Sequence, residues 1–192
     1  SNSFSTNYSE ETWGVLSTIS ISKFGSIKMG ERRKHGYENW GLNNYYSENS
    51  RYKFKENPSP NNDPNLQQNT GYSQVDFFQK FLFKLPYQKL LNINIQYSES
   101  SDIDRYDKLS EGTNSELKFS EWYYGPQKRL LISPSLKFFS QKPLLKRGRI
   151  TLAYQMAEES RINRKFNSID RSSQLEKVNI LSLNGDFDTS FN

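Results

Sequence analysis

Apolar and polar residues alternate with a period of two along much of this 192-residue chain, and no other feature constrains the fold as strongly. Successive side chains of a β-strand point to opposite faces, so the alternation predicts strands with one apolar and one polar face. In the clearest run, Leu91, Ile93 and Ile95 alternate with Asn and Gln residues. We expect six strands, near residues 13–22, 74–85, 91–98, 129–138, 149–156 and 175–187.

Two of these runs contain residues that do not fit a simple alternation. Gln79 falls on the otherwise apolar face of its run. In the last run, two apolar sets compete for the same face, and this leaves the register open; the sets are Val178 with Ile180 and Leu181 with Leu183. Pro134 has no N–H to donate, so we expect a local bulge or a sheet edge at that position.

The connections between the predicted strands alternate between short and long. Residues 85–89 and 140–145 form short turns, whereas the connections near 24–72, 99–117 and 157–174 are long and polar. Outer-membrane β-barrels place short turns on the periplasmic side and long loops on the extracellular side. The predicted fold class is therefore all-β, with antiparallel up-and-down strands. Because about eight strands are needed to close a barrel, these six form part of a transmembrane β-barrel that further strands complete.

The composition fits such a barrel better than a soluble globular domain or a disordered chain. Only 33% of the residues are hydrophobic and the mean hydropathy is −0.89, yet aromatic residues reach 15%. Disorder would deplete aromatic residues, whereas a barrel has a polar interior and aromatic girdles. The chain has no run of about 18 apolar residues, so we expect no transmembrane helix. The net charge of +5 indicates either a mixed, solvated surface, which we favour, or attraction to an anionic partner such as lipopolysaccharide or an anionic ligand.

Two aromatic segments hold the candidate ligand-binding residues. These residues are His35, Tyr37, Trp40, Trp122, Tyr123 and Tyr124. Neutral imidazole binds metals, so His35 is a candidate contact for haem or a metal chelate. A loop histidine with a local hydrogen bond is the alternative, and we favour it. The second segment can stack on a flat ligand, but we favour a structural role, either as an aromatic belt or as a prop between the extracellular ends of the strands.

The sequence contains no recognisable catalytic or metal-binding constellation. With one His and no Cys, a Ser–His–Asp triad would have to be centred on His35, and no Gly-x-Ser-x-Gly motif is present. We therefore expect a protein that is not an enzyme and that carries no metal or cofactor. The acidic residues of the second long loop lack the spacing of a calcium-binding loop. We expect a solvated acidic cluster, paired with Arg105 and Lys108, from Asp102, Asp104, Asp107 and Glu111.

Several stretches of the chain resemble one family. They are Arg33–Gly41, Gly71–Gln74, Ser100–Leu109, Glu121–Lys128 and Ala153–Arg161. In this order and spacing they resemble the middle of the β-barrel in TonB-dependent receptors from Bacteroidota, and the resemblance covers residues 12–187. The Trp-Tyr-Tyr-Gly-Pro-Gln run that begins at Trp122 is its most specific part.

The resemblance implies a barrel of about twenty-two strands plugged by an N-terminal domain, in the outer membrane of a Gram-negative bacterium. Such a receptor takes up a scarce nutrient, commonly a ferric siderophore, haem or cobalamin, with energy delivered through TonB. Residues 1–192 would be a partial barrel without the plug, with lipid, lipopolysaccharide, the nutrient and, through the missing plug, TonB as partners. No nucleic-acid partner is expected, because the basic residues form no dense stripe. The alternative is a soluble β-sheet binding module that uses the long aromatic loop.

Overall fold

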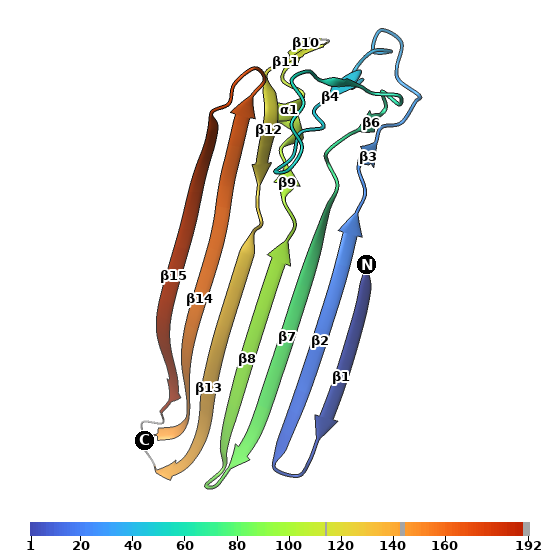
Figure 1. Cartoon of the computed structure of the whole chain (residues 1–192). Coiled ribbons are helices and arrows are strands. Elements are labelled where there is room, and N and C mark those ends of the chain that lie inside the picture. The colour runs from blue at the N-terminus through green and yellow to red at the C-terminus, as the bar shows by residue number, and fades with distance from the viewer. Residues whose placement is uncertain (114, 143–144, 190–192) are drawn as a thin grey trace.

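One large antiparallel sheet dominates the computed structural model, which describes residues 1–113, 115–142 and 145–189 (Figure 1). Its long strands are neighbours in the order in which they occur along the chain. They are β1 (Asn2–Ser9), β2 (Trp13–Phe24), β7 (Tyr72–Leu85), β8 (Lys89–Ser100), β13 (Lys128–Lys142), β14 (Leu145–Lys165) and β15 (Arg171–Asp188). The prediction of an all-β, antiparallel, up-and-down fold is confirmed.

Shorter elements lie at the end of the sheet where the long connections are. β12 (Phe119–Tyr124) pairs with the end of β14 and with β9 (Ile103–Asp104). The remaining elements form two-residue ladders and one helical turn. They are β3 (Ile27–Lys28) with β6 (Leu66–Gln67), β4 (Tyr45–Tyr46) with β5 (Ser59–Pro60), β10 (Gly112–Thr113) with β11 (Glu116–Leu117), and α1 (Tyr106–Leu109). No helix among the described residues is long and apolar enough to cross a membrane.

All six predicted strands are present, and the sequence analysis missed β1. The short turn at 86–88 is confirmed; of the second predicted turn, Pro143 and Leu144 lie outside the described residues. The first two long connections are confirmed: residues 25–71 join β2 to β7, and residues 101–127, which include β12, join β8 to β13. The third predicted loop, 157–174, is wrong, because β14 and β15 continue through most of it and leave only 166–170 as the connection. Its charged residues pair across the strands, as Glu158 does with Lys177 at 3.6 Å, and polarity therefore did not mark a loop.

The registers place the alternating residues of all the long strands on two continuous faces. Along one row of the apolar face, Val15 is opposite Phe81, Phe81 is opposite Ile93, and Ile93 is opposite Pro134. The open register of β15 is settled, because Leu181 lies opposite Tyr154 and Leu183 opposite Leu152. Val178 and Ile180 consequently lie on the polar face.

Two irregular positions on the apolar face have local explanations. Gln79 lies opposite Ser17, whose hydroxyl donates a 2.6 Å hydrogen bond to the Gln79 side-chain oxygen. The two polar side chains thus satisfy each other on an apolar surface. The bulge or edge predicted at Pro134 is wrong: its strand is internal, and the pairing with β14 has the same register before and after Ser133 and Pro134. Only the pairing of these two residues with β14 is lost.

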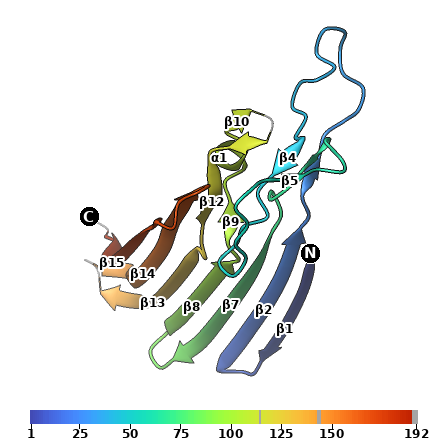
Figure 2. The ribbon, with the colours of Figure 1, turned by 45° about the horizontal axis from the view of Figure 1, so that its top comes forward.

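The sheet is open and has no core of its own (Figure 2). Among the described residues, β1 and β15 each pair on one side only. The buried apolar side chains of the described chain are Leu109, Leu117 and Tyr123, and all three belong to the loop end. On the apolar face, by contrast, Leu181 is 73% and Leu183 72% exposed. A folded monomer rarely leaves so large an apolar surface uncovered, so this face is made to meet a partner or an apolar phase.

Candidate functional site

The apolar face ends, toward the loops, in a row of alternating charges. The row consists of four residues that lie opposite one another on β8, β13, β14 and β15, namely Glu99, Lys128, Glu158 and Lys177. The nitrogen–oxygen distances are 3.7 Å between Lys128 and Glu99 and 3.6 Å between Lys177 and Glu158. From Leu130, the first apolar residue beyond this row, to Phe138, β13 presents an apolar stripe that is about 26 Å long at about 3.3 Å per residue. The pairing neutralises charges at the border of the apolar surface.

Aromatic side chains gather at the opposite border, near the short turns. Tyr8 and Trp13 are in ring contact, with centroids 5.5 Å apart, and Phe138 and Phe187 are 6.4 Å apart. Gly148 lies on β14, opposite Phe138 of β13 and Phe187 of β15, and an added Cβ there would come within 2.5 Å of Phe138 and 2.8 Å of Phe187. A glycine at this point leaves room for both rings on the same face.

The polar face carries hydrogen-bonding side chains and shallow hollows. One hollow, of about 490 Å³, is lined in part by Gln74, Asp76 and Arg129. The Asp76 carboxylate accepts hydrogen bonds from the Ser98 hydroxyl at 2.7 Å and from the Gln74 amide at 2.8 Å. The polar face thus offers hydrogen-bonding groups, although Phe78, Leu131, Val178 and Ile180 also lie on it.

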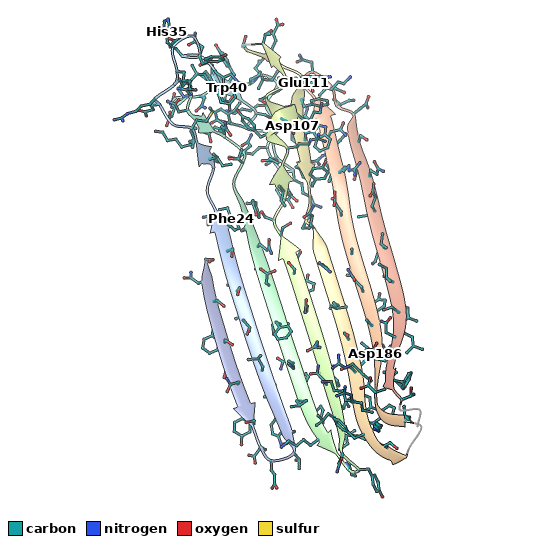
Figure 3. The ribbon with its side chains drawn as sticks, turned by 180° about the vertical axis from the view of Figure 1, so that it is seen from behind. Phe24, His35, Trp40, Asp107, Glu111 and Asp186 are labelled. Atoms are coloured by element: carbon teal, nitrogen blue, oxygen red, sulfur yellow. The ribbon has the colours of Figure 1, made fainter. Side chains whose placement is uncertain are left out.

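The first long connection holds three of the candidate residues, His35, Tyr37 and Trp40, and Figure 3 shows His35 and Trp40 at the loop end. The His35 side chain is fully exposed, and its Nδ1 lies 3.1 Å from the Glu38 carboxylate. Tyr37 is 62% and Trp40 66% exposed, so neither ring belongs to a packed core. The local partner of His35 agrees with the favoured interpretation, and the exposure leaves all three side chains accessible to a ligand.

Trp122, Tyr123 and Tyr124 lie on β12 and alternate between its two sides. The rings of Trp122 and Tyr124 meet edge to face at 5.2 Å, and the Arg105 guanidinium lies 4.7 Å from the Trp122 ring centre. Tyr123 is buried, and its hydroxyl accepts a 3.0 Å hydrogen bond from Arg171. Within the described chain, no hydrogen bond, ion pair or ring contact links these residues to the aromatic loop, so the two candidate groups do not form one site.

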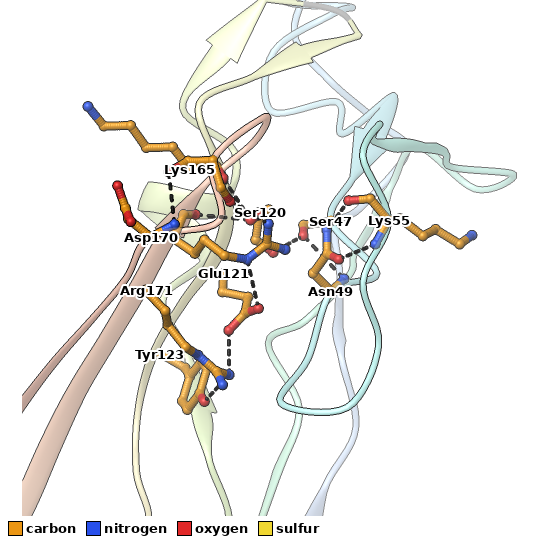
Figure 4. A network of polar contacts seen from close by, with 11 residues as sticks. Ser47, Asn49, Lys55, Ser120, Glu121, Tyr123, Lys165, Asp170 and Arg171 are labelled. Atoms are coloured by element: carbon orange, nitrogen blue, oxygen red, sulfur yellow. Dashed lines mark hydrogen bonds and ion pairs between the residues drawn. The ribbon is translucent and has the colours of Figure 1, made fainter.

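A buried ionic cluster beside Tyr123 was not foreseen from the sequence (Figure 4). The Glu121 side chain is fully buried and accepts hydrogen bonds from Arg164 at 3.1 Å and from Arg171 at 2.5 Å. The Arg164 guanidinium also lies 4.8 Å from the centre of the Phe54 ring, which comes from the first long connection. Removing one partner of such a buried pair leaves an uncompensated charge, so the cluster fixes how the loops pack.

The first long connection is fastened to β12 by a second contact. The buried Ser47 hydroxyl donates a hydrogen bond to the backbone oxygen of Ser120, and the Ser120 hydroxyl donates to the backbone oxygen of Arg164 at 3.1 Å (Figure 4). The register shifts between Phe119 and Glu121, and this irregularity places Ser120 against both segments. The loop is thereby held over the end of the sheet.

The acidic residues of the second connection separate into two groups. As predicted, Arg105 pairs with Asp107 at 2.9 Å and Lys108 pairs with Glu111 at 3.1 Å. The prediction of a solvated cluster is wrong for Asp104, which lies half-buried opposite Tyr123. Desolvation, reinforced by the nearby negative charges of Asp102 and Glu121, raises the pKa of Asp104 to about 7.

The described residues contain no group of three His, Asp or Glu side chains that is arranged to hold a metal ion. Comparison with known proteins gave no match: no family model fits the chain, and no curated protein or solved structure is significantly similar to it.

Proposed function

We propose that this chain is a wall segment of an outer-membrane transport receptor of the TonB-dependent type. Its apolar face would contact lipid, and its polar face would line the lumen of the barrel. The observation that carries the proposal is the apolar face, which extends across every long strand and is covered by no other described segment. In water such a face would drive aggregation, whereas lipid solvates it.

The dimensions of the apolar face support the same proposal. A stripe of about 26 Å on a strand tilted by about 40° would span roughly 20 Å along the membrane normal, close to the apolar band of about 25 Å in outer-membrane barrels. Paired charges at one border and aromatic rings at the other are appropriate to the two membrane interfaces. The hydrogen bond between Ser17 and Gln79 fits as well, because polar groups within lipid need an internal partner.

Within this proposal the loop end faces the outside of the cell and takes part in nutrient capture. The cargo would be a ferric siderophore, haem or a similar compound, and the exposed side chains of His35, Tyr37 and Trp40 are positioned to touch it first. Replacing His35 and Tyr37 with Ala should lower the uptake of that cargo. Unchanged uptake would remove both residues from the binding site without affecting the assignment of the sheet.

The orientation of the sheet can be tested with cysteine variants, since the chain contains no native Cys. Ile93→Cys and Asn94→Cys place a nitroxide label on opposite faces of β8 in the intact protein in its membrane. We expect the label at position 93 to collide readily with oxygen, which dissolves in lipid, and poorly with a water-soluble nickel chelate. The label at position 94 should collide readily with the nickel chelate and poorly with oxygen.

Two results would contradict the membrane assignment. One is a label at position 93 that the nickel chelate reaches as freely as it reaches position 94. The other is a label at position 93 that neither reagent reaches, together with recovery of the protein in the soluble fraction. The second result would favour the alternative, a soluble β-sheet binding module whose apolar face is covered by protein.

A further inference from the structure

Three cations line one hollow of the polar face near the short turns. Lys80, Lys137 and Arg149 come from β7, β13 and β14, and the hollow between them has a volume of about 370 Å³. The other lining residues are Leu82, Leu90, Asn92, Asn94, Ser133, Ser135 and Thr151. The lining therefore combines three positive charges with amide and hydroxyl groups and contains no carboxylate.

Two of these cations are direct cross-strand neighbours. Lys137 lies opposite Arg149 in the register of β13 and β14, which places their Cβ atoms about 4.5–5.5 Å apart. Like charges in this position repel each other and destabilise a sheet. An acidic residue in place of Lys137 would have been stabilising, so the pairing of two cations costs stability.

The same three cations have no anionic partner in the described chain. No ion pair or side-chain hydrogen bond joins any of them, Lys80, Lys137 or Arg149, to another described residue. Asp186 lies opposite Arg149 on β15, near the turn end of the sheet (Figure 3), but the two make no ion pair. On the other face, Lys128 is paired with a glutamate. None of the three cations that line this hollow is therefore ion-paired within the described chain.

We propose that this hollow is a binding site for a small polyvalent oxyanion, such as phosphate or a tricarboxylate. The Arg149 guanidinium offers two parallel N–H donors to such a group, and the Lys137 ammonium opposite it adds charge-assisted hydrogen bonds. Lys80 lies four residues further along the sheet, in the row of Asn94 and Ser133, and adds positive charge to the hollow. The nearby Ser135 hydroxyl can donate to a remaining oxygen. The site depends only on the register of the strands and on the residues of the polar face. The proposal is therefore independent of whether lipid or protein contacts the apolar face.

The test measures binding of inorganic phosphate to the full chain by calorimetry, and its thermal unfolding with phosphate or chloride at equal ionic strength. Lys137→Gln and Arg149→Gln remove one cation each, and Lys89→Gln is the control, because Lys89 lies at the turn and outside the hollow. We expect phosphate to raise the Tm of the wild type. Each variant of the hollow should weaken phosphate binding by about tenfold, whereas Lys89→Gln should leave it unchanged.

A second readout separates a binding role from a structural one. In chloride, Lys137→Gln should unfold at or above the wild-type temperature because the repulsion with Arg149 is relieved, although it binds phosphate more weakly. If either variant fails to fold, Lys80→Gln replaces it in the same comparison. The proposal is overturned if phosphate does not bind the wild type, or if the variants of the hollow and Lys89→Gln respond to it alike.

Discussion

Placing a charge in the middle of the apolar face tests the central physical claim directly. Leu152 lies on β14 between the charged row at Glu158, about 20 Å away along the strand, and Gly148, about 13 Å away. Leu152→Arg would therefore hold a guanidinium near the centre of a bilayer. The matched control is Ala153→Arg, because the next residue of the same strand points to the polar face.

The expected loss of folding free energy depends on where the substituted residue lies in the bilayer. An Arg on the lipid face of a barrel near the bilayer midplane lowers stability by about 2–4 kcal/mol, which is roughly a 30- to 1,000-fold change in the folding equilibrium. In water the result would differ, because Leu152 is 43% exposed in the sheet and substitutions of exposed residues usually change stability by only about 0.5 kcal/mol. The two environments thus predict clearly different values.

The measurement is urea-induced unfolding of the intact protein in lipid vesicles, followed by tryptophan fluorescence. We expect the unfolding midpoint of Leu152→Arg to fall well below that of Ala153→Arg, which should stay close to the wild type. Equal midpoints for the two variants would refute the reasoning, because they would mean that the two faces meet similar surroundings.

Two further predictions concern the loop end. The folded protein keeps the Asp104 proton up to about pH 7, whereas the unfolded chain releases it near its ordinary pKa of 3.8. The packing of this loop should therefore weaken as the pH rises from about 4 to 7. The hydrogen-exchange protection factors of its amides should be lower at pH 8 than at pH 5, and Asp104→Asn should abolish this difference. Gly125→Ala should destabilise the protein by about 1–3 kcal/mol, since φ is +148° and a Cβ would lie 2.6 Å from the Asp102 Cα. Gly30→Ala, with nothing within 4 Å, should be close to neutral in the same thermal unfolding assay.

The sheet could be predicted from the sequence because its alternation is local. Each strand was identified from its own residues, and a partner strand was needed only where two apolar sets compete, as Leu181 and Ile180 do on β15. β1 was missed because Phe4 and Tyr8 stand among small polar residues and give a weak pattern. Its eight residues were recognised only through pairing with β2.

The loop-end cluster could not be predicted, because its members are brought together by the fold alone. Glu121 meets Arg164 and Arg171 across separations of 43 and 50 residues. Nothing in the local sequence distinguishes these three charges from the exposed ones around them. The same reason explains Asp104, whose acidic neighbours suggested solvent exposure although the Tyr123 strand lies beside it.

The direction of the edge strands adds a constraint to the proposed barrel. β1 and β15 run the same way, because an odd number of long strands separates one edge from the other in an antiparallel meander (Figure 1). Joining these two edges directly would create a parallel pair, which an up-and-down barrel does not contain. Both edges carry unpaired backbone groups that lipid cannot satisfy. If the apolar face meets lipid, an odd number of additional strands must therefore lie between β15 and β1, which gives the even total of bacterial barrels.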